Sequence, residues 1–90
     1  MKFIFKSSFK DGSGFYPSAL INVNYIESIF LGKDYDGYCY ELTMVSGGSF
    51  YIKDRKEIEA LESLLLESGI TPGQIEALKE VADTTFKSKF

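Results

Sequence analysis

The sequence predicts an α+β fold: an antiparallel sheet of about four or five short strands over residues 2–53, followed by two helices. Before Asp54 the chain is rich in Gly, Tyr, Phe and Ile, which alternate with polar residues as in strands. After Asp54, Glu, Leu, Ala and Lys dominate, as in helices. Strands first and helices second is the order of an α+β domain. We expect an αα-hairpin, with helices at about 54–68 and 72–86, packed on one face of the sheet.

The composition fits a single small domain, residues 1–90. Of its residues 44% are hydrophobic, and eight Phe and six Tyr supply much of the surface that a core must bury. One cysteine allows no internal disulfide, so we expect a reducing, cytoplasmic location. The apolar stretches fall short of the roughly 20 residues that cross a bilayer, so no membrane partner is expected.

Alternating apolar residues predict strands at about 2–9, 18–23, 25–31, 38–45 and 49–53. Turns are expected at 10–14 and 33–37, where Gly and Asp cluster. Asn22 and Asn24 interrupt the stretch 19–30, and we predict a turn there between two short strands. Asn24 is the expected breaking point, because asparagine tolerates left-handed backbone angles.

The pair Gly47-Gly48 predicts a hairpin with a two-residue loop, in which both glycines adopt positive φ. Such a loop pairs Val45 with Phe50 and thereby assigns alternate side chains to two faces. One face carries Tyr38, Tyr40, Leu42, Met44, Tyr51 and Lys53. The other carries Cys39, Glu41, Thr43, Val45, Phe50 and Ile52. Neither face is polar, so helices must cover one, and the tyrosine-rich face is either covered too or a docking surface.

Capping residues mark the start of both helices. Asp54, with Glu57 three residues later, is typical of a capping box. Thr71, Pro72 and Gln74 repeat that pattern before the second helix. Apolar residues three and four apart then form a stripe along each helix, which is the expected core-facing side.

The side chains of most catalytic and metal sites are missing. The chain has no histidine and one cysteine, Cys39, which removes the usual general base, the Ser-His and Cys-His pairs and the common zinc ligands. Asp34, Asp36 and Gly37 resemble the start of a calcium loop, but the following residues do not keep its spacing. The sequence therefore predicts a non-catalytic protein that holds no metal and no cofactor.

The charge is distributed unevenly along the chain. Residues 1–53 carry five basic and five acidic side chains, whereas residues 54–90 carry five basic and eight acidic ones, so the net charge of −3 arises in the helical part. Nucleic-acid binders typically show a basic surface instead.

Residues 18–66 resemble two families. The segment LINVNYIESI, a polar turn, YELTMVSGGSFYI and a helix starting at KDRKEI follow one another as in the second half of LytTR-type DNA-binding domains. The same order is similar to small FlbD-like flagellar and phage proteins. The LytTR resemblance implies DNA contacts by Ser18, Asn22, Arg55 and Lys56, whereas the FlbD-like resemblance implies little chemistry.

Two functions of different classes are predicted. The first is a small protein-interaction module, a regulator or inhibitor of the kind that phages encode, which binds a protein partner through its acidic helices and the aromatic sheet face with Tyr38, Tyr40, Met44 and Tyr51. The alternative is a LytTR-like DNA-binding domain that uses Ser18, Asn22, Arg55 and Lys56. An exposed sheet edge also allows a homodimer.

Overall fold

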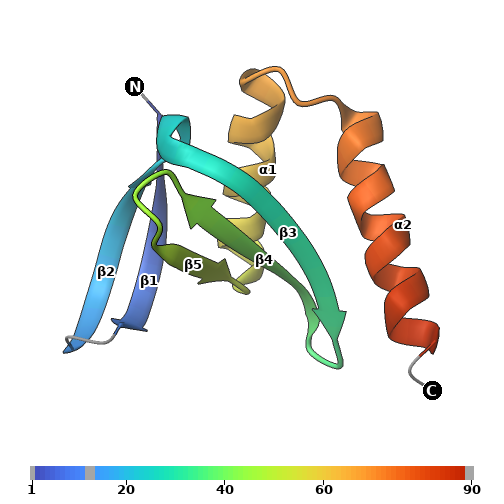
Figure 1. Cartoon of the computed structure of the whole chain (residues 1–90), viewed down its shortest axis with the longest axis horizontal. Helices are drawn as coiled ribbons and strands as arrows, with labels where there is room; N and C mark the ends of the chain where they lie inside the picture. Colours follow the sequence, from blue (N-terminus) through green and yellow to red (C-terminus); the bar gives the residue numbers. More distant parts are fainter. Residues whose placement is uncertain (1, 12–13, 89–90) are drawn as a thin grey trace.

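In the computed structural model, which describes residues 2–11 and 14–88, the chain forms two antiparallel sheets and two helices (Figure 1). The α+β class is therefore confirmed. The strands, in chain order, are β1 (Phe3–Asp11), β2 (Gly14–Asn22), β3 (Ile26–Asp34), β4 (Gly37–Met44) and β5 (Ser49–Ile52). The prediction of one sheet is wrong: β1 pairs with β2, and β3-β4-β5 form a separate sheet, so each sheet has fewer strands than predicted.

The predicted turn between the two asparagines separates the sheets. A single 3₁₀ turn, Val23–Tyr25, follows β2, and the Asn22 side chain accepts a hydrogen bond of 2.9 Å from the Asn24 backbone N–H. The side chain of Val23 is buried, and its N–H donates to the Lys2 carbonyl oxygen at 2.9 Å. The turn thus closes the first sheet and sends the chain into a second one, which is why β2 and β3 do not pair.

The loop between β4 and β5 differs from the prediction. Leu42 lies opposite Phe50, and Glu41 lies opposite Tyr51. The loop is three residues long, 45–47, because the Met44 N–H donates to the Gly48 carbonyl oxygen (2.8 Å) and the Gly47 N–H donates to the Met44 carbonyl oxygen (2.9 Å). Only one glycine of the pair needs the left-handed region, since φ is +97° at Gly47 whereas Gly48 has no positive φ.

This register moves β5 by an odd number of residues relative to the prediction, which turns its side chains to the opposite faces. Phe50 and Ile52 therefore share the inner face with Tyr40, Leu42 and Met44. Tyr51 points to the other side and is 55% exposed.

The turns predicted at 33–37 and 10–14 have different outcomes. The turn within 33–37 is confirmed: Asp34 lies opposite Gly37, and the Asp36 N–H donates to Asp34 Oδ1 at 2.8 Å. The turn predicted at 10–14 is too long: Lys10 and Asp11 belong to β1 and Gly14 belongs to β2, whereas Gly12 and Ser13 lie outside the described residues.

Both predicted helices are present, as α1 (Arg55–Glu67) and α2 (Pro72–Ser88). The Asp54 side chain caps α1 by accepting from the backbone N–H groups of Lys56 and Glu57. Thr71 and Gln74 cap each other reciprocally, as in a capping box. The carboxylate of Glu57, however, is buried and accepts from the backbone N–H and the hydroxyl of Ser7 at 2.9 and 2.8 Å. This residue therefore joins α1 to β1 instead of completing its own cap.

The two helices make their closest contacts with different sheets. α1 lies against β1 of the two-stranded sheet, and α2 lies along β3 of the three-stranded sheet, on the side away from β4 (Figure 1). The predicted αα-hairpin on a single face is thus not confirmed. Gly69 ends α1 as predicted, with φ of +105°, and the Ile70 N–H donates back to the Leu65 carbonyl oxygen.

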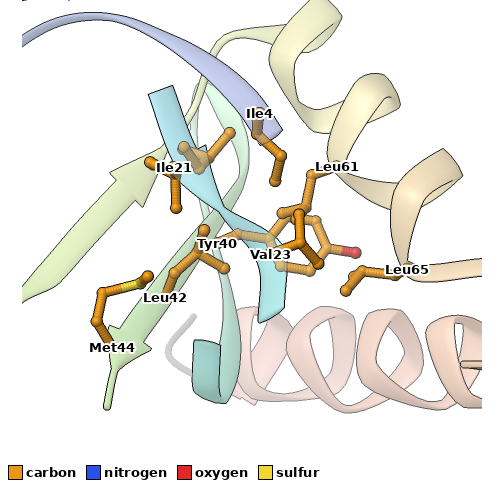
Figure 2. Packing of buried hydrophobic residues seen from close by; sticks show 9 residues of the cluster. Ile4, Ile21, Val23, Tyr40, Leu42, Met44, Leu61 and Leu65 are labelled. Atoms are coloured by element: carbon orange, nitrogen blue, oxygen red, sulfur yellow. The ribbon is translucent and has the colours of Figure 1, made fainter. Parts of the chain in front are cut away.

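The core lies between the two sheets and α1 (Figure 2). Tyr40 is its largest fully buried side chain. The buried residues come from β1 and β2, the 3₁₀ turn, β4, β5 and α1; they are Ile4, Ile21, Val23, Tyr40, Leu42, Met44, Ile52, Leu61 and Leu65. The alternation in β1 places Ile4 inside and leaves Phe3 and Phe5 exposed, so the first sheet has one covered face.

The two glycines of the β4–β5 loop allow a direct test of its length. Gly47→Ala should lower the free energy of unfolding by about 1–2 kcal/mol, because alanine is strained in the left-handed region. Gly48→Ala should be neutral or stabilise by up to about 1 kcal/mol, since it only restricts the unfolded chain. Neither added methyl group meets another atom within 4 Å, so the backbone alone decides. Urea unfolding measures the free energy of unfolding of both variants. An equal loss in the two variants would indicate the two-residue loop.

Candidate functional site

A groove of about 800 Å³ lies between β3 and α2. Its lining is mostly apolar, and no described residue of β4 or β5 contributes to it. One wall is made by β3 and the other by α2, whose position beside β3 is seen in Figure 1. A cavity of this size and character is the usual form of a binding site.

The β3 wall of the groove is a strand edge. Every residue from Ser28 to Leu31 lines the groove, although successive side chains of a strand point to opposite faces of its sheet. The groove must therefore run along the edge of β3. Among the described strands β3 pairs with β4 alone, so this edge has no strand partner.

The α2 wall follows one side of the helix and is mostly apolar. Gln74, Ala77, Leu78 and Val81 stand at the three- and four-residue spacing that brings side chains to the same side of a helix. Leu78 packs against the core, whereas Val81 is 67% exposed. Phe30 of β3, which also lines the groove, is 57% exposed. Two large apolar side chains of the lining are thus open to solvent.

Polar contacts hold the C-terminal part of α2 against the β3–β4 hairpin. Asp83 accepts hydrogen bonds from Lys33 Nζ at 3.0 Å and from the Tyr38 hydroxyl at 2.9 Å. The bond from Lys33, followed by that from Tyr38, lowers the pKa of the Asp83 carboxyl below its ordinary value. Burial, and then the bond to Asp83, raises the pKa of Tyr38.

A second link joins β4, α1 and α2. The hydroxyl of the buried Tyr40 donates to Glu62 Oε2 at 2.7 Å, and Lys79 Nζ of α2 lies 3.3 Å from the same oxygen. Burial, together with the bond to Glu62, raises the pKa of Tyr40 far above its usual range, so the phenol stays protonated and donates. The position of α2, and hence the width of the groove, is tied to the core.

The groove offers apolar side chains, strand-edge backbone groups and one carboxylate. Among the described residues that line it, Glu27 is the one with a charge. The register of β3 on β4 shifts between Ile26 and Ser28, so Glu27 lies at an irregularity of the strand. Within the described residues, no group of three or more His, Cys, Asp and Glu could hold a metal ion.

The predicted partner-binding residues do not form one surface. Tyr40 and Met44 are buried in the core, and Tyr38 is half-buried and bonded to Asp83. Tyr51 is exposed, but on the opposite face of the sheet. The face assignment is wrong because the loop has three residues rather than two, and this reverses the faces of β5.

The residues of the predicted DNA site lie on two elements, β2 and α1. Ser18 and Asn22 lie on β2, and Asn22 caps the 3₁₀ turn. Arg55 and Lys56 begin α1, where Arg55 pairs with Glu59 at 3.7 Å. Nearby, Lys53 pairs with Asp34 at 3.0 Å. These basic side chains are interleaved with carboxylates.

The residues that line the groove were not singled out from the sequence. Ile29, Phe30 and Leu31 are apolar on both sides of their strand, a pattern that indicates contacts beyond one buried face. Ala77 and Val81 likewise widen the stripe of the last helix beyond its core-facing residues. These two patterns could have indicated the groove.

A second exposed apolar region lies at the first sheet. Phe5 and Leu20 are opposite each other on β1 and β2, and both are exposed. A hollow of about 420 Å³ adjoins Leu20, Tyr25 and Val45. This hollow has about half the volume of the groove, and no described residue of α1 or α2 lines it.

Comparisons with models of protein families, with curated proteins and with solved structures found no match to this chain. The resemblances to LytTR-type and FlbD-like proteins therefore stay predictions. Neither described helix is long and apolar enough to cross a membrane.

The link from the core to α2 can be tested by Tyr40→Phe. We expect the free energy of unfolding to fall by about 1.5–3 kcal/mol, because a hydrogen bond to a charged group is lost. Tyr51→Phe, at an exposed position, is the matched control and should stay within about 0.5 kcal/mol of the wild type. Urea unfolding compares the two, and an equal loss in both variants would contradict the buried link.

The bonds to Asp83 predict a pH dependence. The pKa of Asp83 is lower in the folded chain than in the unfolded one. At pH values between these two pKa values, the unfolded chain therefore binds more protons than the folded chain. The stabilisation is fully present above the ordinary aspartate value of about 4 and is lost at lower pH. Asp83→Asn should therefore destabilise the protein at pH 7 and have progressively less effect below about pH 4. Urea unfolding at pH 7 and at pH 3 measures the difference in the free energy of unfolding between the variant and the wild type. The same difference at both pH values would contradict the prediction. Glu76→Gln on the same helix is the control.

Proposed function

We propose that this chain is a small non-catalytic protein-interaction module that binds a protein partner in the groove between β3 and α2. The observation that carries the proposal is an apolar groove that runs along an unpaired strand edge and has a helix as its second wall. The proposed docking surface is thus this groove and not the tyrosine-rich sheet face that the sequence predicted. We propose that the module is a cytoplasmic regulator or inhibitor.

The exposed apolar side chains that line the groove supply affinity for a partner. Burying a side chain such as Phe30 or Val81 is worth roughly 1.5–3 kcal/mol relative to leaving it in water. Aromatic residues are typical of the desolvated centre of protein interfaces. The groove therefore supports a partner that presents apolar groups.

The charge of the groove favours a positively charged partner. Glu27 is the one charged residue among the described residues that line the groove. Its carboxylate attracts a partner with positive charge and raises the rate of association. In contrast, the basic side chains of the predicted DNA site are interleaved with carboxylates, so no observation favours DNA binding.

A partner-capture experiment tests the proposal. The wild type and Phe30→Asp are immobilised and exposed to a lysate of the cells that make this protein. We expect a partner to be retained by the wild type at moderate salt, and its retention to fall at least about tenfold in Phe30→Asp, because a charge in the apolar groove is unpaired.

Val45→Asp is the matched control, since it places the same charge on an exposed apolar residue outside the groove. This variant should retain the partner as the wild type does. If no protein is retained specifically, or if both variants retain it equally, the groove is not the docking surface and the proposal fails.

A further inference from the structure

We infer that the groove binds its partner as an extended peptide segment, which adds a strand to the edge of β3 and places a lysine or arginine beside Glu27. This inference rests on the proposed function and specifies the occupant of the same groove. It follows from the strand edge, the spacing of the groove residues, the charge of the lining and the position of α2.

The backbone of β3 favours an extended occupant. An edge strand presents a row of N–H and C=O groups that another strand can bind. The edge of β3 faces the groove, so an added strand would satisfy these groups while its side chains contact α2. A helical occupant would cover the same groups without bonding to them, and buried unsatisfied groups are costly.

The dimensions of the groove set the length and pattern of the peptide. The groove follows β3 from Ile26 to Leu31, and six residues of a strand span about 20 Å. Ile29 and Leu31 pack toward the core, whereas Phe30 is exposed. Alternate side chains of an added strand would continue these two faces. We therefore expect apolar residues at every second position of the peptide.

The lining selects the charge of the peptide. Glu27 is an exposed carboxylate in an otherwise uncharged described lining, at an irregularity of β3. A cationic side chain at the corresponding end of the peptide would pair with it. An acidic side chain there would be repelled, so this pair confers specificity as well as affinity.

A second copy of the chain fits the same edge poorly. Strand pairing between two β3 edges would bring a whole second sheet to the place where α2 lies. Two copies paired at this edge would each have to accommodate the α2 helix of the other. A peptide segment, which brings no further sheet, avoids this overlap.

The experiment selects ligands from a library of random 12-residue peptides displayed on phage, with the full chain as the target. Selected peptides are synthesised with a fluorescent label, and their dissociation constants are measured by polarisation. We expect apolar residues at alternate positions and at least one lysine or arginine. Hydrogen exchange of the full chain should slow at β3 when peptide is bound.

Two charge variants form the control pair. Glu27→Lys should weaken binding of the selected peptide at least about tenfold, because the pair becomes repulsive. Glu76→Lys makes the same change in charge at an exposed position of α2 outside the groove, and should alter the affinity less than about twofold. Circular dichroism checks that both variants are folded.

Three outcomes would overturn the inference. In the first, the selected peptides have apolar residues spaced three and four apart and do not slow hydrogen exchange at β3. In the second, the selection yields no binder. In the third, hydrogen exchange at β3 slows with increasing protein concentration in the absence of peptide, which would indicate a second copy. Each of these leaves the proposed function standing if partner capture still depends on Phe30. Loss of that dependence, in turn, would refute the proposed function itself.

Discussion

The hydrogen bond from the buried Tyr40 to Glu62 is the interaction on which the arrangement of the molecule depends. The phenol lies at the centre of the core, where two sheets and α1 meet, and its hydroxyl reaches the polar side of α1. Glu62 also pairs with Lys79, so one carboxylate connects β4, α1 and α2. Because this bond requires a protonated phenol, the burial that raises the pKa of Tyr40 also preserves the bond.

The position of α2 limits access to the open strand edge of the three-stranded sheet. A strand edge left open can pair with other chains and lead to aggregation. Here α2 stands beside β3 and narrows access to its edge, while Asp83 ties the helix to Lys33 and Tyr38. The helix that protects this edge also forms one wall of the groove.

The sequence predicted the local features well and the register poorly. The turn after β2 and the caps at Asp54 and Thr71 depend on side chains that bond to a neighbouring backbone, and all three are present. In the turn, however, the bonding side chain is that of Asn22 and not that of Asn24, the expected breaking point. The predicted loop length of the β4–β5 hairpin was wrong, because Gly47-Gly48 is compatible with loops of two and three residues. The wrong loop length placed Tyr51 on the wrong face of the sheet. The predicted docking surface therefore combined residues that the structure separates.

By itself, the sequence determined the α+β class, the two helices with their caps, the lack of histidine and the lack of an internal disulfide. These are properties of composition or of contacts a few residues apart. The tertiary structure alone decided the division into two sheets, the inward position of Tyr40 and the groove at β3. Each of these depends on contacts between distant segments, such as Glu57 with Ser7 and Asp83 with Lys33, whose energies no local pattern encodes.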